Sequence, residues 1–538
     1  MLGVVLAAVL LGTVLPYLYA AAQSNQEFIF GGFLLNPTDG NSYLAKMYQG
    51  WRGDWRFTLP YNAEAGQGAY LFLFYLALGH LARLSGISLV FFFHIARLIS
   101  ILVLLLSLNR FFIAVLPNPR HRYLAFALSA VGSGLGWLAV LFGGFTSDFW
   151  VAEAYPFLSA YANPHFPLGL ALLLWILTPP VVHRHDRVQS LGFWLRRQWP
   201  VIPISLALSA ITPFGVVIAC AVLGGIWIWA ILEGQADLPV GLYLARLTWT
   251  ALSGLPLLFY AVWVTYADPY LRVWNQQNLT PSPRIIDLFI SFFPLLLLAG
   301  LGGWQLIVNR RKEQVGNWDN WRIPLVWAVL ALILVYIPLN LQRRFLMGLY
   351  VPLAALAAPG LEWLAGGKVR RYWFLAVLVF FIILPTNLVI LLTARHAAQT
   401  HDPAIYLFRD ESLAFNWLHQ QAPAGSIVLA APQTGLLIPG YTGLGVIYGH
   451  PFETVNAKKQ EQAVIDAYSG RLDAAAVQAL LDEYGVDFVF YGPRERSLGA
   501  LPPMSRLMPV YQHGEVTIYA VVAWDVSRSE GRWRLVIR

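Results

Sequence analysis

The stretch YWFLAVLVFFIILPTNLVILLTA, residues 372–394, has no charged residue and is almost entirely apolar. A helix of about twenty apolar residues crosses the hydrocarbon core of a bilayer, so this stretch predicts a transmembrane span. From about His396 the pattern changes to charged helices that alternate with short β-rich runs. The sequence therefore predicts a membrane module, residues 1–394, followed by a water-soluble domain, residues 395–538.

The composition of the whole chain also indicates a membrane protein. Of its 538 residues, 58% are hydrophobic and 12% are charged, whereas a soluble domain carries about 25% charged residues. The net charge of +8 comes mainly from short loops between apolar runs, where it orients the chain and gives no support for a nucleic-acid partner. The single cysteine, Cys220, lies in an apolar run, which excludes disulfides and cysteine metal sites.

Eleven stretches are predicted to cross the membrane: 1–22, 89–109, 123–144, 166–182, 200–213, 215–232, 241–265, 285–308, 323–339, 345–360 and 372–394. Thr212-Pro213 is either a turn between two spans or a kink in one. We expect residues 1–22 to be a retained helix. The alternative is a signal peptide cleaved after Ala20-Ala21-Ala22, and both interpretations place Gln23 outside.

Basic loops orient these spans. Loops 110–122, 183–199, 309–322 and 361–371 carry Arg110, Arg120, Arg122, Arg184, Arg187, Arg196, Arg197, Arg310, Arg311, Lys312, Arg322, Lys368, Arg370 and Arg371, and they alternate with loops poor in Lys and Arg. The positive-inside rule then predicts a multi-pass protein of the cytoplasmic membrane. Loops 145–165, 266–284 and 340–344 and the C-terminal domain are expected outside.

The stretch 69–84 is apolar but short, and Gly79, His80 and Arg83 interrupt it. We expect it to lie in the interface or to re-enter, which keeps residues 23–68 on the outer side as part of a long outer loop, 23–88. If it crosses instead, residues 23–68 become cytoplasmic.

The C-terminal domain is predicted to be a small α/β layer. The expected helices are 411–421, 457–468 and 473–484, and the expected strands are 426–430, 486–491, 508–512 and 516–521. The basic tail 528–538 is either a headgroup-binding segment or a last strand. Because no glycine-rich phosphate-binding motif occurs, nucleotide binding has no support.

The first outer loop contains an acidic residue, Asp39, that opens a short helix with Tyr43 and Lys46 on one face. The nearby Trp51, Trp55 and Tyr61 are typical of an interfacial helix. The structural alternative for Asp39 is a cap, because Asn36 and Pro37 precede it at the positions of an N-cap and a first helical residue. Both roles are compatible.

Two further clusters contain candidate residues. Asp148 and Glu153 lie in a second outer loop, which is followed by Asn163 and His165 at the mouth of the next span. Acidic groups and a histidine at such a position are typical of acid/base catalysis or metal binding. The alternative is a solvated carboxylate, which we favour for Asp148.

The paired arginines Arg343 and Arg344 occupy a tight outer connection, against the positive-inside bias. Guanidinium groups bind phosphate bidentately, so we favour a specific phosphate site over snorkelling to ordinary headgroups. Within the bilayer, His94 and Arg97 lie one helical turn apart, either as functional groups or as a structural pair.

This layout resembles the GT-C superfamily of membrane glycosyltransferases, which includes protein O-mannosyltransferases and bacterial aminoarabinose transferases. The resemblance rests on Asp39 in the first outer loop, Glu153 in the second, Arg343-Arg344, and an outer α/β domain after the last helix. Short motifs look like those of uncharacterised bacterial members: Gly132-Ser-Gly-Leu-Gly-Trp137, Asn163-Pro-His-Phe166, Gln342-Arg-Arg-Phe345 and Gly449-His-Pro-Phe-Glu-Thr454.

The resemblance implies transfer of a sugar from a polyprenyl phosphate or diphosphate to a glycan, lipid or protein acceptor at the outer face, as in the synthesis of cell-envelope glycans. It implies that Asp39 is the general base and that Arg343 and Arg344 hold the leaving phosphate. The remaining candidates are cavity-lining or acceptor-binding residues: Tyr43, Lys46, His94, Arg97, Glu153, Asn163, His165, His450 and Glu453. Asp39 is followed by Gly40, whereas many members have an adjacent Asp-Glu pair.

No metal or other cofactor is firmly implied, and donors of this kind often need none. Two other functions stay open at this point. Polar residues at mid-membrane also occur in transporters, and a non-catalytic assembly subunit can keep the fold.

Overall fold

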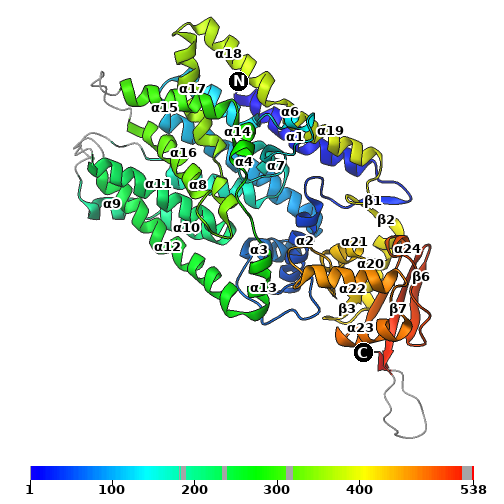
Figure 1. Cartoon of the computed structure of the whole chain (residues 1–538). Coiled ribbons are helices and arrows are strands. Elements are labelled where there is room, and N and C mark those ends of the chain that lie inside the picture. Colours follow the sequence, from blue (N-terminus) through cyan, green and yellow to red (C-terminus); the bar gives the residue numbers. More distant parts are fainter. Residues whose placement is uncertain are drawn as a thin grey trace. The chain divides into compact units, whose positions relative to one another are not determined.

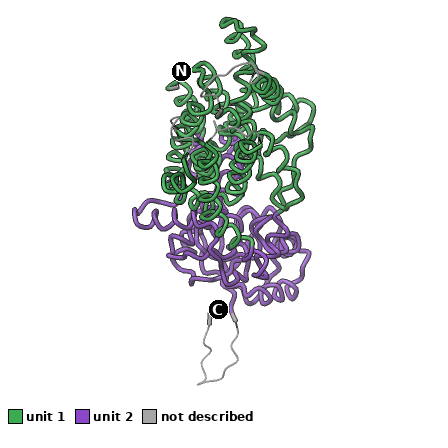
Figure 2. The backbone as a smooth tube through the Cα atoms, turned by 90° about the vertical axis from the view of Figure 1, so that its left-hand side faces the viewer, with its two compact units in different colours: residues 1–16, 94–262, 279–395 green, residues 17–93, 263–278, 396–538 purple. Residues whose placement is uncertain are grey.

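The computed structural model describes residues 2–180, 182, 189–232, 239–309, 319–523 and 536–537. The described chain divides into two compact units, coloured separately in Figure 2. Unit 1 comprises residues 1–16, 94–262 and 279–395, and unit 2 comprises residues 17–93, 263–278 and 396–538. The residues 23–88, predicted as an outer loop of the membrane module, thus belong to the unit that contains the C-terminal domain.

Unit 1 is built from helices. Four of its helices have residues in both units: α1 (Leu2–Ala22), α4 (Leu89–Val115), α12 (Val240–Ala267) and α19 (Pro385–Gln399), whose residues 396–399 belong to unit 2. The others are α5 (Pro119–Val131), α6 (Gly136–Val140), η1 (Ser147–Phe149), α7 (Pro156–Tyr161), α8 (His165–Leu177), α9 (Leu191–Arg197), α10 (Val201–Ile211), α11 (Pro213–Leu232), α14 (Ile285–Phe292), α15 (Leu295–Asn309), η3 (Asp319–Trp321), α16 (Arg322–Leu334), η4 (Gln342–Leu346), α17 (Tyr350–Ala365) and α18 (Val369–Ile383).

Among the described residues, seven helical stretches are long and apolar enough to cross a membrane. They are Gly3–Ala22, Leu89–Val115, Pro119–Val140, Pro213–Leu232, Val240–Ala267, Gln342–Ala365 and Val369–Gln399. An eighth span is possible if α14 and α15, which meet at an angle of 82°, count as one. The long stretches coincide with seven of the predicted spans, and the bent pair with an eighth.

The other three predicted spans are shorter than expected. Helices α8, α10 and α16 have 13, 11 and 13 residues, and 13 residues rise only about 20 Å against a hydrocarbon core of about 30 Å. Proline explains two of the ends: α8 stops before Pro179-Pro180, and Thr212 separates α10 from Pro213 at the start of α11. Thr212-Pro213 is therefore a turn and not a kink.

Unit 2 contains all the described strands. Within residues 1–394 it has β1 (Phe28–Phe30), α2 (Pro37–Arg52), α3 (Leu73–Ser85) and α13 (Pro269–Gln277). After the module follow β2 (Tyr406–Phe408), α20 (Arg409–Gln421), β3 (Ile427–Leu429), α21 (Pro432–Thr442), β4 (Gly445–Val446), α22 (Ala457–Tyr468), α23 (Ala474–Glu483), β5 (Phe488–Tyr491), α24 (Pro493–Leu498), β6 (Leu507–His513), β7 (Val516–Ala523) and β8 (Val536–Ile537).

The C-terminal domain is a three-layer α/β structure (Figure 1). The strands run in the order β4-β3-β5-β7-β6, with β3 parallel to β4 and β5, and with β7 antiparallel to β5, β6 and β8. Because side chains alternate along a strand, Phe488 and Phe490 pack with α20 and α21, whereas Val489 packs with α22 and α23. The predicted α/β layer and its helices and strands are confirmed.

The N-terminal part of unit 2 joins the C-terminal domain through the backbone. Strand β1 pairs antiparallel with β2, with Phe28 opposite Phe408. Strands that pair in this way lie on one side of any membrane, so residues 23–68 share the side of the C-terminal domain. Helix α3, with 13 residues, occupies most of the stretch 69–84 and is not among the described helices that are long and apolar enough to cross a membrane. That this stretch lies in the interface or re-enters stays a prediction.

Several predicted segments lie outside the described residues. They are residues 183–188 of the basic loop 183–199, including Arg184 and Arg187, the loop residues Arg310, Arg311 and Lys312, and the tail 528–538 apart from Val536–Ile537 in β8.

Helices α2 and α3 approach so closely that only glycine fits between them. A Cβ on Gly79 would lie 1.9 Å from the carbonyl oxygen of Met47, and one on Gly50 would lie 2.0 Å from that of Leu76. We expect Gly79→Ala to force the helices apart and to cost at least roughly 1–3 kcal/mol, seen as a lower thermal unfolding midpoint in detergent. The control Gly300→Ala, whose Cβ meets nothing within 4 Å, should leave the midpoint unchanged. Equal midpoints for the two variants would contradict this packing.

Candidate active site

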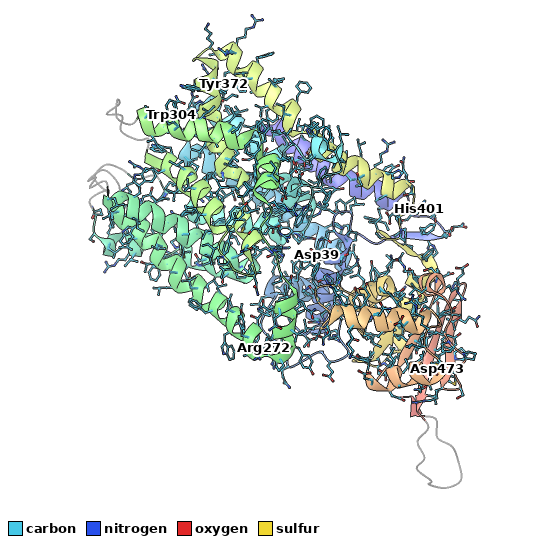
Figure 3. All side chains as sticks on the ribbon, viewed as in Figure 1. Asp39, Arg272, Trp304, Tyr372, His401 and Asp473 are labelled. Atoms are coloured by element: carbon cyan, nitrogen blue, oxygen red, sulfur yellow. The ribbon has the colours of Figure 1, made fainter. Side chains whose placement is uncertain are left out.

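Asp39 lies in the first turn of α2, where Figure 3 labels it. Asn36 caps this helix: its Oδ1 accepts from the Asp39 amide at 3.5 Å, and its Nδ2 donates to Asp39 Oδ2 at 2.5 Å. Pro37 takes the first helical position. The predicted capping arrangement is confirmed, and it holds the carboxylate in one orientation while 37% of the side chain stays exposed.

The second element of this cluster is the loop that contains Gly449-His-Pro-Phe-Glu-Thr454. His450 is 2% exposed, and its Nδ1 accepts from the amides of Phe452 and Glu453 at 3.1 and 3.2 Å. Its Nε2 lies 3.7 Å from Asp39 Oδ1. The loop is closed by Thr454, whose hydroxyl accepts from the His450 amide at 3.2 Å. The structure thus brings His450 and Asp39 together from opposite ends of the chain.

A buried ion pair holds the same loop against α2. Lys46 Nζ lies 2.7 Å from Glu453 Oε1 and 2.5 Å from Ser42 Oγ, and the Lys46 side chain is fully buried. Three aromatic rings surround the ammonium, with centroids 4.5 Å (Phe72), 5.2 Å (Tyr43) and 5.5 Å (Phe57) away. This environment offsets the cost of removing Lys46 from water, because cation–π contacts and a paired carboxylate take the place of the water molecules.

The electrostatics of the cluster favour an ionised Glu453. Burial raises the pKa of Glu453, but the positive charge of Lys46 and the hydrogen bonds from Lys46 and Ser42 outweigh burial and lower the pKa below its ordinary value. Burial, together with the charges of Glu453 and Asp39, raises the pKa of Tyr61 well above its usual range. Tyr61 therefore stays protonated and donates to the carbonyl of Leu436 at 3.2 Å.

A separate cluster in unit 1 joins the second outer loop to the arginine pair. Glu153 Oε1 lies 3.3 Å from Arg344 Nη1 and 3.7 Å from Arg343 Nε. The backbone fixes this arrangement, since the Gly348 amide donates to the Glu153 carbonyl at 2.8 Å and the Arg343 amide donates to Thr280 at 3.1 Å. The guanidinium of Arg343 lies 4.4 Å from the centre of the Trp150 ring.

The two guanidinium groups of this second cluster share the Glu153 carboxylate. That carboxylate is 4% exposed, while the side chains of Arg343 and Arg344 are 16% and 24% exposed. Solvent therefore reaches both arginine side chains.

Asp148 is not solvated as predicted; it is fully buried. Its carboxylate accepts from the amides of Gly134 and Gly136 at 3.1 and 2.9 Å and from Thr146 Oγ1 at 2.6 Å. A Cβ on Gly136 would lie 2.5 Å from Asp148 Oδ1, which explains a glycine in the motif 132–137. Asp148 is a structural residue that organises this loop.

Four other predicted site residues lie in unit 1: Arg97, Asn163 and His165 are buried, and His94 is half-buried. Asn163 and His165 are 2% and 8% exposed at the start of α8. Arg97 donates to His94 Nδ1 at 3.3 Å and to the carbonyls of Thr13 and Ala160 at 2.9 and 3.2 Å. These carbonyl contacts favour the structural interpretation of the His94–Arg97 pair.

Three residues of the unit 2 cluster were not predicted as members. Ser42 bonds Lys46 and Glu453, Tyr61 packs on His450 with ring centroids 5.5 Å apart, and Asn62 donates to the Glu453 carbonyl at 3.1 Å. Tyr61 was interpreted as an interfacial aromatic, but it is fully buried. The contact of Ser42 with Lys46 could have been predicted, because Ser42 precedes Lys46 by one helical turn and so lies on the same helix face. No group of three potential metal ligands occurs among the described residues.

No protein-family model and no curated protein matches this sequence. Solved structures do match. The oligosaccharyltransferase of Archaeoglobus fulgidus, in complex with zinc and sulfate, aligns with 91% of this chain and 67% of its own at a TM-score of 0.53 and 11% identity. The archaeal oligosaccharyltransferase AglB from Archaeoglobus fulgidus, solved with an inhibitory peptide and a dolichol-phosphate, aligns with 91% of this chain and 68% of its own. The TM-score is 0.53 and the sequence identity is 10%.

The arabinofuranosyltransferase AftD from Mycobacteria aligns with 96% of this chain at a TM-score of 0.50 and 16% identity, and this chain spans 40% of its length. At such identities the likeness establishes the fold. The chain therefore has the GT-C fold of these polytopic membrane glycosyltransferases.

The pair Lys46–Glu453 offers a direct test of the unit 2 cluster. Glu453→Gln should destabilise the protein by about 3–5 kcal/mol, because it leaves the buried ammonium of Lys46 without its counter-charge. The double variant Lys46→Met with Glu453→Gln should recover most of that loss, since no buried charge remains. Thermal unfolding in detergent measures both. A double variant no more stable than Glu453→Gln alone would show that the ion pair does not set the stability of this cluster.

Proposed function

We propose that this chain is a membrane glycosyltransferase that moves a sugar from a polyprenyl-phosphate-type donor to an acceptor at the outer face of the cytoplasmic membrane. The GT-C fold supports the enzyme class. The observation that carries the proposal is Asp39, a carboxylate fixed by its own helix cap, partly exposed, and faced by a buried imidazole.

Asp39 is proposed as the general base. In the transfer step the acceptor hydroxyl gives its proton to the Asp39 carboxylate while its oxygen forms a bond to the anomeric carbon of the sugar. The bond between that carbon and the phosphate oxygen breaks, and the electron pair leaves with the phosphate. Asn36 Nδ2, on Oδ2, holds the carboxylate in a single rotamer for this reaction.

Arg343 and Arg344 are proposed to bind the donor phosphate. A prenyl-linked sugar monophosphate is a diester with one negative charge, and the two partly exposed guanidinium groups have the geometry to bind its oxygens bidentately. When the sugar leaves, the phosphate becomes a monoester and its negative charge grows, so the guanidinium groups stabilise the transition state more than the bound donor. AglB, solved with a dolichol-phosphate, provides the precedent for a ligand of this kind on this fold.

The acceptor class stays open between glycan, lipid and protein. The exposed part of Asp39 is the point where an acceptor hydroxyl reaches the base. The outer-face assignment rests on the predicted charge asymmetry of the loops and on the shared side of residues 23–68 and the C-terminal domain.

Asp39→Asn should reduce transfer of radiolabelled sugar from polyprenyl-phosphate-linked donors, extracted from bacterial membranes, by about 100-fold or more. The amide cannot take the acceptor proton but keeps the size of the side chain, so the unfolding midpoint should not change. Asp54→Asn, which alters an exposed carboxylate paired with Arg52, is the control and should transfer normally. Full activity of Asp39→Asn would remove Asp39 from the mechanism, and solute flux in vesicles without sugar transfer would favour a transporter.

Arg344→Ala should weaken the binding of undecaprenyl phosphate about 10- to 100-fold, the loss expected for one charge-assisted phosphate contact. Quenching of tryptophan fluorescence measures it, because Trp150 lies against Arg343. Arg272→Ala, which removes an exposed arginine of α13, should bind the lipid as the wild type does. Unchanged affinity of Arg344→Ala would reject the phosphate assignment.

A further inference from the structure

We infer that His450 is a positioning residue for Asp39: it presents one fixed N–H to Asp39 Oδ1 and so holds the carboxylate in the orientation that accepts the acceptor proton. The inference rests on the proposed function, because it assumes that Asp39 is the base. It assigns to the C-terminal domain a direct part in the reaction.

The loop leaves the imidazole only one donor position. Nδ1 already accepts two backbone N–H groups, from Phe452 at 3.1 Å and from Glu453 at 3.2 Å. A ring nitrogen that accepts carries no proton, so in the neutral ring the proton sits on Nε2. The tautomer of His450 is therefore set by the backbone of its own loop.

Nε2 then needs an acceptor. It is buried and has no hydrogen-bond partner among the described residues, and Asp39 Oδ1 lies 3.7 Å from it. A buried donor without a partner is unfavourable, so its pairing with Asp39 is favoured. The atoms must approach by only about 0.7 Å to reach an ordinary hydrogen-bond distance.

Three contacts prevent the loop from drifting away from α2. Lys46 binds Glu453 at 2.7 Å, Asn62 donates to the Glu453 carbonyl at 3.1 Å, and Gln277 of α13 donates to the Thr454 carbonyl at 2.8 Å. The ring of Tyr61 covers His450. Because these contacts come from three separate segments, the imidazole is held in place independently of Asp39. It can therefore orient the Asp39 carboxylate.

His450 does not take the transferred proton. The proton of the acceptor passes to Asp39, and the N–H of His450 stays on Nε2 throughout. Its effect is to keep Oδ1 in the position from which the carboxylate accepts the proton of the acceptor.

Two variants separate this role from a purely structural one. His450→Asn keeps an acceptor near the position of Nδ1, so it preserves the loop, but no donor reaches Asp39. His450→Gln reaches the position of Nε2 with an N–H donor. We expect His450→Asn to lower kcat about 10- to 100-fold with an unchanged KM for the lipid-linked donor, and His450→Gln to restore most of the activity.

The control is His513→Asn, which removes an exposed histidine that is paired with Asp410 on the same unit. It should transfer sugar normally. Nitrogen-15 NMR of the histidine-labelled full chain in detergent supplies a second measurement: the His450 signals, identified by their loss in His450→Gln, should show the proton on Nε2 and should shift in Asp39→Asn.

The outcomes distinguish the two proposals. If Asp39→Asn is inactive and His450→Asn is fully active, or if His450→Gln is as inactive as His450→Asn, the role of His450 is wrong and the glycosyltransferase stands. If His450→Asn does not fold, the NMR signals decide, and a proton on Nδ1 overturns the inference. If Asp39→Asn retains full transfer, the proposed base fails, whatever the histidine variants do.

Discussion

The ion pair between Lys46 and Glu453 is the interaction on which unit 2 depends. It joins helix α2 to the loop 449–454 of the C-terminal domain, and the two residues are 407 positions apart along the chain. Both charges are buried. An ammonium in such a place is tolerated only because a carboxylate, a hydroxyl and three aromatic rings replace its water. The pair also fixes the position of the loop that carries His450. Stability and the geometry of the candidate base therefore have the same origin.

In unit 1, as in unit 2, each buried polar group needs a hydrogen-bond partner. In unit 1 these partners are mostly backbone groups. The carboxylate of Asp148 accepts from glycine amides, and the guanidinium of Arg97 donates to carbonyls of α1 and α7. Glu153 with Arg343 and Arg344 is the exception, since these charged side chains pair with one another and both arginines are partly exposed to solvent. That partial exposure distinguishes a candidate binding group from groups that only support the fold.

The sequence predicted much of this architecture, because hydropathy and periodicity are local signals. The helix 457–468 and the strand 516–521 were predicted from such patterns, and so was the cap of α2, whose residues Asn36, Pro37 and Asp39 are neighbours. Distant pairings were beyond these signals. Nothing in the sequence near Glu453 indicates that Lys46 is its partner. The predicted environments of Asp148 and Tyr61 were wrong, because both residues are buried by tertiary contacts that local patterns do not reveal. Arg322, counted among the loop charges, is buried between Trp229 and Trp321, because a guanidinium stacks on aromatic faces.

The pairing of β1 with β2 has a consequence for biosynthesis. Strand β1 leaves the ribosome early, but its partner Tyr406–Phe408 is made only after the membrane module. The hydroxyl of Tyr406 that bonds the carbonyl of Ala20 arrives 386 residues later than its acceptor. Throughout translation of the intervening helices, β1 presents an unpaired edge and Lys46 has no counter-ion. Unit 2 can therefore be completed only after the intervening helices have been made, and a nascent chain arrested within them lacks the partners of both β1 and Lys46.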